Sequence, residues 1–435
     1  MVEEFRKLKM DNIKNVETLD FTKIMPVKSE ATETAIVVPD VPEERKKLPL
    51  ITGGFLNVTQ SCNLACKYCF VVQCPKNITL ETAKDAAKFF ARNALTSGSR
   101  PSINFFGGEP MIRYEDIIKP LTIWIRKTYG DSFGLGLTTN GTLLNRDVME
   151  FFKENDVGML FSIDGDKKTQ DINRPFHGGK GSFDKLEEII DLVLEYHPNM
   201  TFRATIDPPT HKYLFDNYKF AISKGYNNSF FIPNVFNKWS DSDLEELEGE
   251  LIKIKDYYIE ELINNRKPMI YSHFEEAKAD INRIARLNEG EFREDGQGMP
   301  ACGRCGLGAG TFASVGASGK LYSCQEMVEN PDVGDEFLIG DIYNGVDEDK
   351  RWQIADSFNT RDVKCSKEEY CKDCPKYRIC NGGCTINNYF KTKDLHIQDY
   401  VLCWHERKCI EMAFEILKAV KDAGAEWNGT KFKEC

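Results

Sequence analysis

The sequence predicts an α/β protein with a parallel sheet, followed by a small cysteine-rich domain. Between residue 55 and about residue 234, strand-like runs alternate with amphipathic, helix-like runs in a regular β-then-α order. Ten of the fifteen cysteines fall between residues 302 and 409, among Gly, Asp and Lys and with little periodicity. The first pattern is typical of βαβ units. The second indicates a small domain that is organised by metal.

Six strands account for the sheet, and their carboxyl ends form the edge where ligands gather in such folds. Helix-like runs with apolar residues at helical spacing separate them, most clearly at 80–95 and 182–196. We therefore expect a ligand site on the loops that follow the strands. The predicted strands are 55–58, 103–106, 135–139, 159–163, 201–206 and 229–233.

The organisation along the chain follows from shifts in composition. The first fifty residues are charged and contain one strand-like run, 34–38, so they are expected to form an arm and linker. A charged helical stretch, about 245–287, follows the sheet, and a helix over about 406–423 closes the chain. The expected divisions are 1–50 (arm and linker), 51–240 (sheet with its helices), 241–298 (helical connector), 299–410 (cysteine-rich domain) and 411–435 (C-terminal helix and tail).

Composition excludes several classes of function. The 435-residue chain carries a formal net charge of −11, with acids and bases mixed throughout, which argues against nucleic-acid binding. No run of about 18 apolar residues exists, so no membrane span is expected. The N-terminus lacks the apolar segment of a secretory signal. A cytoplasmic protein with reduced thiols is expected, in which clustered cysteines indicate metal binding or redox chemistry.

The segment "SCNLACKYCF" places three cysteines, Cys62, Cys66 and Cys69, directly behind the first predicted strand. A structural zinc site prefers four closed ligands, and Cys74, next to Pro75, is the available fourth cysteine. The alternative is a four-iron cube, on which three thiolates leave one iron open to an external ligand. The spacing alone leaves the two alternatives at close to even odds.

The second strand ends in "GGEP", Gly107, Gly108, Glu109 and Pro110, on the same edge of the sheet as the cysteine segment. Glycines permit close approach of backbone, and Glu109 offers a carboxylate to an ammonium group. Taken alone, this motif also fits a simple turn before a helix.

Together, Cys62-x3-Cys66-x2-Cys69 with the aromatic Tyr68, followed by GGEP, resembles the radical S-adenosylmethionine (SAM) enzymes. The resemblance extends over most of the chain and implies a partial (β/α)6 barrel, similar to a TIM barrel. It also implies a [4Fe–4S] cube on the three cysteines, with the methionine amine and carboxylate of SAM on the open iron and GGEP holding the amine. Reductive cleavage of SAM then yields a 5′-deoxyadenosyl radical that abstracts hydrogen.

Further matches follow at the ends of later strands. "TTNGTLL" and "FSIDGDKKTQDINR" resemble the third and fourth strand ends of the family, which implies that Asn140, Ser162 and Asp164 lie near the cofactor. "FRATI" adds Arg203, a cation suited to the methionine carboxylate. Structural roles remain open for each: a turn at Asn140, helix caps at Ser162 and Asp164, and an ion pair at Arg203.

The C-terminal cysteines resemble the seven-cysteine SPASM extension of radical SAM enzymes, which carries two auxiliary [4Fe–4S] clusters. The matching features are a Gly-x4-Cys element at Gly319 and Cys324, a hairpin turn at 317–320, and four closely spaced cysteines ahead of a last one. Zinc ribbons would leave several of these features unexplained. Carried over, the resemblance assigns one cluster to Cys371, Cys374, Cys380 and Cys403, and the other to Cys305, Cys324 and Cys384, with Cys302 or an open iron as the fourth position. Cys365, Cys409 and Cys435 have no place in it, with Cys365 the first candidate for a substitute ligand.

The resemblance implies an oxidoreductase that uses SAM and three [4Fe–4S] clusters to modify a ribosomally made precursor peptide. We expect a Cys thioether of the sactipeptide or ranthipeptide kind, with a carbon–carbon cross-link as the nearest alternative. In relatives that oxidise Cys or Ser to formylglycine, an Asp base follows the Gly-x4-Cys cysteine; Gln325 stands there in this chain, and an amide cannot accept the proton. Glu326 would substitute only if the backbone turned it inward, and an anaerobic sulfatase-maturing, formylglycine-forming enzyme is therefore the further alternative.

The sequence also indicates partners and candidate bases. The expected partners are a precursor peptide with a leader, which the arm could recognise in part, and an electron donor of flavodoxin or ferredoxin type. No nucleic acid or membrane is expected. The catalytic base is not assigned, and Glu326, Tyr322 and Asp341 are only candidates. An iron–sulfur electron carrier is the non-enzymatic alternative, although it would need neither GGEP nor a barrel.

Overall fold

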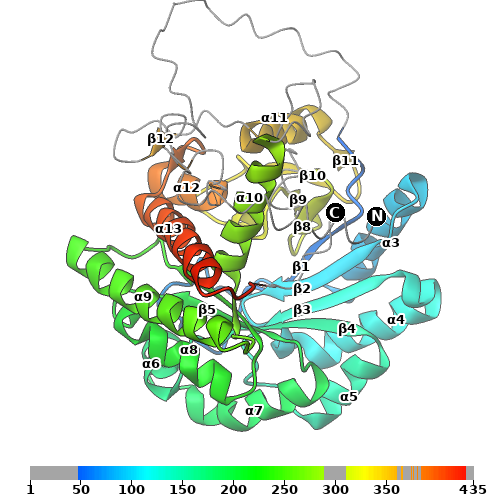
Figure 1. The fold of residues 1–435 in the computed structure, drawn as a ribbon. Helices are drawn as coiled ribbons and strands as arrows, with labels where there is room; N and C mark the ends of the chain where they lie inside the picture. Colours follow the sequence, from blue (N-terminus) through cyan, green and yellow to red (C-terminus); the bar gives the residue numbers. More distant parts are fainter. Residues whose placement is uncertain are drawn as a thin grey trace, which may run out of the picture.

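A computed structural model describes residues 48–288, 310–359, 364–365, 374, 376, 380 and 384–427. Parallel strands and outer helices make up its first half, and helices with a small antiparallel extension make up the rest (Figure 1). The strands are β1 (Gly53–Thr59), β2 (Ser102–Gly107), β3 (Gly134–Thr139), β4 (Val157–Phe161), β5 (Thr201–Ile206), β6 (Asn228–Pro233), β7 (Ile270–Tyr271), β8 (Phe312–Val315), β9 (Lys320–Tyr322), β10 (Leu338–Asp341), β11 (Gly345–Val346), β12 (Lys364–Cys365) and β13 (Ile397–Gln398).

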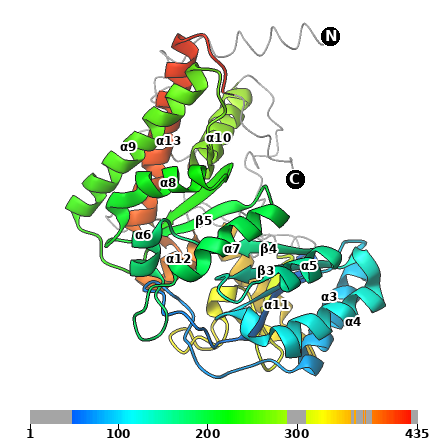
Figure 2. The same ribbon diagram turned by 90° about the horizontal axis from the view of Figure 1, so that it is seen from below.

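The helices between these strands lie mainly on the outer side of the sheet, with α9, α10 and α13 packed together at one end (Figures 1 and 2). The α-helices are α3 (Leu80–Ser97), α4 (Lys119–Tyr129), α5 (Arg146–Glu154), α6 (Lys167–Asn173), α7 (Phe183–Tyr196), α8 (Leu214–Ser223), α9 (Asp241–Ile263), α10 (Ser272–Asn288), α11 (Glu348–Asn359), α12 (Thr385–Thr392) and α13 (Tyr400–Asp422). Short turns of other helix types are η3 (Pro110–Arg113), η4 (Tyr114–Ile118), η5 (Gly130–Ser132), η6 (His211–Tyr213) and η7 (Gln325–Met327).

The six predicted strands are confirmed as parallel neighbours. Strands β1 to β4 pair in sequence order, and β5 pairs with β6. The two groups meet where the chain leaves β4: Ser162 forms a parallel bridge with Arg203, and the backbone N–H of Ile163 donates to the Arg203 carbonyl at 3.1 Å. This single bridge continues the curved sheet from β1 to β6, and the α/β fold expected from the sequence is confirmed.

Amphipathic patterning explains how the outer helices attach. In α3 the fully buried residues Ala83, Ala86, Ala87 and Phe90 recur at helical spacing and face the sheet. Opposite them, strand residues such as Phe105 are fully buried. One continuous apolar core therefore fixes the strands, and with them the loops at their carboxyl ends.

Three features of the fold were not apparent from the sequence. The connector contains the two-residue strand β7, which extends the sheet beside β6. Strand β8 pairs in parallel with β1, so the β8–β9 hairpin and β10 are joined to the first sheet. The closing helix α13 begins at Tyr400, six residues earlier than expected, because the Asp399 carboxylate caps it by accepting from the N–H groups of Val401 and Leu402.

The predicted hairpin turn at 317–320 is confirmed between β8 and β9. Gly319 has a φ of 85°, and its N–H donates to the Gly316 carbonyl at 3.0 Å. The strand-like run 34–38 lies outside the described residues, and the expected domain boundaries stay predictions. Among the helices of the described ranges, none is both long enough and apolar enough to cross a membrane.

Candidate active site

The three cysteines of the first motif occupy the loop that follows β1. Cys62 and Cys66 are half-buried, and Cys69 is exposed at the surface. Burial raises the pKa of the Cys62 thiol to about 11 and that of Cys66 to about 12, and each thiol also feels the charge of the other motif cysteines. Metal binding would therefore have to remove protons from thiols that the fold alone keeps protonated.

Three thiols on one loop are the donor set that a [4Fe–4S] cube takes. Among the described residues, no group of three Cys, His, Asp or Glu side chains is arranged to hold a single metal ion. Cys74 donates its S–H to the Gln60 side-chain oxygen at 2.7 Å.

A segment at the end of α6 holds this loop in place. The N–H of Ala65 donates to the Pro175 carbonyl at 2.8 Å, and the N–H of Lys67 donates to the Asn173 carbonyl at 2.9 Å. Leu64 forms an antiparallel bridge with Phe176. We call residues 173–177, which begin at the last residue of α6, the strap. Because these bonds join backbone to backbone, the strap fixes the path of the cysteine loop itself.

The GGEP residues lie beside the cysteine loop, as expected. The N–H of Gly108 donates to the Thr59 carbonyl at 2.8 Å, and that of Glu109 donates to the Ser61 carbonyl at 2.9 Å. A Cβ on Gly107 would lie 2.0 Å from the Thr59 carbonyl oxygen, and Gly107 has a φ of 132°. Only glycine permits this approach, and Pro110 then begins η3.

The Glu109 carboxylate is 1% exposed and accepts three hydrogen bonds. Its donors are the N–H of Asn140 at 2.7 Å, the Thr139 hydroxyl at 2.8 Å and the N–H of Met111 at 3.0 Å. Burial raises the pKa of Glu109, and the backbone donors oppose the rise. The carboxylate is therefore fixed at the end of β2.

The other predicted cofactor residues lie on the same edge. The Asn140 side chain contacts the cysteine loop, donating to the Asn63 oxygen at 2.9 Å, and accepts from the Thr142 hydroxyl at 2.7 Å. Ser162 lies at the bridge to β5. Arg203, on β5, stacks over the Phe230 ring at 4.1 Å. Its buried Nη1 has no hydrogen-bond partner among the described residues, so a guanidinium donor remains for a carboxylate ligand.

Asp164 is held by hydrogen bonds from three parts of the chain. It is 2% exposed, and its carboxylate accepts from the Tyr68 hydroxyl at 2.5 Å, the Asn173 amide at 3.0 Å and the N–H of Thr205 at 3.2 Å. These bonds tie the cysteine loop, the strap and β5 together. The sequence did not single out Arg174, whose Nη1 donates to the Tyr68 hydroxyl at 2.9 Å. The signal was its place at the end of the matching "DINR" stretch.

The described C-terminal cysteines fall into two environments. Cys324, at the start of η7, and Cys384, at the start of α12, pack against one apolar cluster built around Met327, Phe337 and Ile386. The sequence assigned both to the same auxiliary cluster. Cys380 packs against a separate cluster between α10 and α13, and Cys403 is buried on α13. Cys374 is half-buried, and Cys409 is buried on α13. Cys302, Cys305, Cys371 and Cys435 lie outside the described residues, as does the side chain of Cys365.

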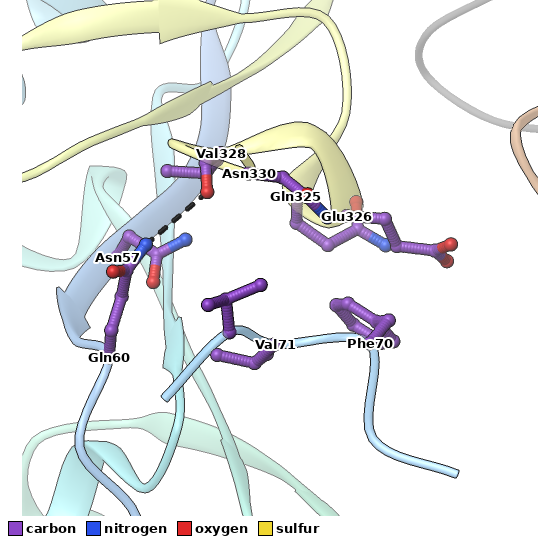
Figure 3. Close-up of a pocket in the computed structure, with 9 residues that line it drawn as sticks. Asn57, Gln60, Phe70, Val71, Gln325, Glu326, Val328 and Asn330 are labelled. Atoms are coloured by element: carbon purple, nitrogen blue, oxygen red, sulfur yellow. Dashed lines mark hydrogen bonds between the residues drawn. The ribbon is translucent and has the colours of Figure 1, made fainter. Parts of the chain in front are cut away.

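A pocket lies between the cysteine loop and the turn that follows Cys324. Figure 3 shows Phe70 and Val71, just after Cys69, on one wall and Gln325 with Glu326 on the opposite wall. Asn57 and Gln60 line the side formed by the end of β1, where the Gln60 amide donates to the Val328 carbonyl at 3.3 Å.

The other candidate bases can now be placed. Burial raises the pKa of Glu326 to about 7, which Arg203 opposes, and its Oε2 is buried with no partner in the described part of the chain. Tyr322 is buried on β9, and burial raises its pKa to about 12. The Asp341 carboxylate instead accepts from the N–H groups of Tyr343 and Asn344 in a turn.

The fold and this edge define a curved parallel sheet with a cofactor site at the carboxyl ends of its strands. Residues 56–221 match the family model described as "Radical SAM superfamily". The chain therefore contains a radical SAM domain.

Relatives with similar sequences cover most of the chain. A cysteine-type anaerobic sulfatase-maturating enzyme of Clostridium novyi is 24% identical over 76% of this chain and 86% of its own length. The serine-type anaerobic sulfatase-maturating enzyme of Bacteroides thetaiotaomicron is 26% identical over 77% of this chain and 82% of its own length.

Solved structures show the same fold. The structure of anSMEcpe with bound AdoMet has a TM-score of 0.66 at 20% identity and covers 85% of this chain and 98% of that one. The structure of Streptococcus suis SuiB bound to precursor peptide SuiA has a TM-score of 0.55 at 18% identity. It covers 91% of this chain and 87% of the SuiB chain.

Proposed function

We propose that this chain is a radical SAM peptide maturase that oxidatively closes a cross-link in a ribosomally made precursor peptide, in the first instance a Cys thioether. A carbon–carbon cross-link is the nearest variant. The proposal assigns the SAM cluster to Cys62, Cys66 and Cys69 and two auxiliary clusters to the C-terminal cysteines. A donor of flavodoxin or ferredoxin type supplies the electron. Relatives whose printed names include sulfatase maturation and a precursor peptide support a peptide as substrate.

The observation that carries the proposal is the position of the pocket. One wall follows directly on Cys69, and the other follows directly on Cys324. The pocket is small, about 10 Å³, so a peptide would lie at its opening, between the source of the radical and an acceptor of one electron. Closing a cross-link removes two hydrogens from the peptide: one leaves as an atom, and the other as a proton with an electron that must be accepted nearby.

The chain's own residues have distinct tasks in this scheme. When bound, SAM and its cluster supply the carbon radical that abstracts hydrogen. The Glu109 carboxylate, fixed by three donors, holds the amine of SAM, and the Arg203 guanidinium faces its carboxylate. Phe70 and Val71 form an apolar wall that excludes water from the reacting carbon.

The experiment is anaerobic reconstitution with excess SAM and reductant, followed by addition of candidate precursor peptides. We expect 5′-deoxyadenosine to form and the peptide to lose two hydrogens per cross-link. Tandem mass spectrometry locates the bond, and alkylation of free thiols separates a thioether from a carbon–carbon bond. A fully reconstituted protein that forms no deoxyadenosine would refute the proposal.

One observation favours a second candidate, formylglycine formation. Gln325 occupies the place of the expected Asp base, but the adjacent Glu326 is turned inward, with a buried Oε2 and Arg203 within electrostatic reach. The test uses a sulfatase-type peptide with a Cys or Ser target and detects an aldehyde by hydrazide labelling. Aldehyde formation that is lost in Glu326→Gln, while deoxyadenosine still forms, would replace the cross-linking proposal.

A further inference from the structure

Arg174 is a buried cation that neither the motifs nor the proposed chemistry uses. It is 8% exposed and lies in the strap, between Asn173 and Pro175, whose carbonyls hold the cysteine loop. A guanidinium buried away from water is costly unless anions surround it. Its presence at this place therefore needs an electrostatic explanation.

The partners of Arg174 in the structure satisfy it only in part. Its Nη1 donates to the Tyr68 hydroxyl at 2.9 Å and lies 4.0 Å from the Asp164 Oδ1. Asp164 is itself already bonded by three neutral donors. The Nε of Arg174 is buried and meets no acceptor among the residues that the structure describes. One N–H of this cation thus has no acceptor in the described part of the chain.

Hydrogen bonds place Arg174 against the loop that carries the motif thiols. Its two neighbours in the strap accept from the N–H groups of Ala65 and Lys67. Its own Nη1 donates to the hydroxyl of Tyr68, which stands between two of the three motif cysteines in the chain. A positive charge is therefore held beside the loop whose thiolates would carry negative charge.

We propose that Arg174 is a positioning residue for the SAM cluster: from the strap it supplies the positive charge that offsets the thiolate-bound cube and makes its reduction easier. The reduced cube carries one more negative charge than the oxidised one, so a nearby cation stabilises the reduced form. The inference rests on the proposed cluster at Cys62, Cys66 and Cys69. The inference concerns the reduction potential of that cluster and not the substrate of the enzyme.

The test compares Arg174→Gln, Arg174→Lys and Tyr68→Phe in the full-length reconstituted protein. Iron content is measured first, and the midpoint potential is then followed by EPR on the reduced signal that changes when SAM is added. That response distinguishes the cube of the cysteine loop from any auxiliary cluster. The matched control is Arg146→Gln, at an exposed position on α5 that pairs with Glu195 on α7.

We expect Arg174→Gln to keep its iron but to weaken one-electron reduction about tenfold, a shift of about 59 mV to more negative potential. Arg174→Lys, which keeps the charge, should shift the potential less. Tyr68→Phe removes the hydrogen bond but not the cation, so its potential should stay close to that of the wild type.

Two outcomes would overturn the inference. One is an unchanged potential in Arg174→Gln with iron retained. The other is an equal effect of Arg174→Gln, Arg174→Lys and Tyr68→Phe, either on potential or as loss of iron, because Arg174 would then act only as a structural tie. A wild-type protein with no SAM-responsive signal would instead refute the proposed function.

Discussion

The two groups of described cysteines are held by different forces. The loop with Cys62, Cys66 and Cys69 is fixed by backbone hydrogen bonds to the strap and by the hydrogen bonds of Tyr68 to Asp164 and Arg174. Cys324 and Cys384 instead rest against an apolar cluster that includes Phe337 and Tyr389. The first group is ordered by directional polar contacts, and the second by packing.

The contrast suggests that the two regions can be perturbed separately. Directional bonds fix the path of a loop to a fraction of an ångström, which suits a site where a radical must be aimed at one carbon. Apolar packing sets the distance between segments but is tolerant of small shifts. Changes in the first region should affect SAM chemistry, and changes in the second should affect the auxiliary sites.

The largest effect is expected from replacing Cys62, Cys66 and Cys69 together by Ala. Deoxyadenosine formation should fall to background, because no cube remains to deliver an electron to SAM. Iron should fall from about twelve to about eight per chain, as expected for loss of one of three cubes. Iron and sulfide analysis with Mössbauer spectra measures this. Loss of all iron would show that the two regions are not independent.

The packed region is tested by Phe337→Ala. Phe337 is 1% exposed and packs edge-on against the Tyr389 ring, with 5.0 Å between centroids. We expect a loss of about 3–5 kcal/mol in the free energy of unfolding and less iron in the C-terminal region, while uncoupled SAM cleavage persists. Denaturant titration and iron analysis check this. Leu95→Ala, at an exposed position on α3, should change stability by less than about 0.5 kcal/mol. Loss of SAM cleavage in Phe337→Ala would contradict the separation.

The packing of α10 against α13 should weaken in acid. His273 on α10 packs against His405 on α13, with ring centroids 4.7 Å apart, and burial lowers the pKa of His273 to about 4. The unfolded chain therefore takes up the proton first, so stability falls as pH drops from about 6.5 to about 4. The loss from this group should reach about 2 kcal/mol at pH 5. Thermal unfolding between pH 7.5 and 5 measures it, and His273→Gln should show a shallower decline. An equally steep decline in that variant would assign the acid sensitivity to other groups.

The smallest effect is expected from Thr142→Val, which keeps the shape of the side chain. The Thr142 hydroxyl accepts from the Asn63 amide at 2.8 Å and donates to the Asn140 oxygen at 2.7 Å. Its loss should cost about 1–2 kcal/mol, seen as a lower Tm, and should weaken SAM binding by equilibrium dialysis. Thr96→Val, at an exposed helix position, is the control. Unchanged SAM binding in Thr142→Val would show that the polar network does not position the cofactor edge.

Much of the fold could be predicted from local pattern. The six strands and helix α3 follow from the spacing of apolar residues, which depends only on the period of each element. The parallel pairing of β8 with β1 could not be predicted, because pairing between segments about 260 residues apart leaves no periodic signal in the sequence. The early start of α13 was missed because one carboxylate, Asp399, decides it.

For the site, the sequence by itself determined which functional groups are present. These are three cysteines at fixed spacing, a glycine-rich turn with one carboxylate, and a second group of cysteines. These are local features, readable because their residues are neighbours in the chain. Only the tertiary structure decided that Arg174 lies buried behind Tyr68, that the strap holds the cysteine loop, and that Glu326 turns inward opposite Phe70. The physical reason is that the energy of a buried charge or polar group depends on what surrounds it, and those partners come from strands and helices far apart in the chain.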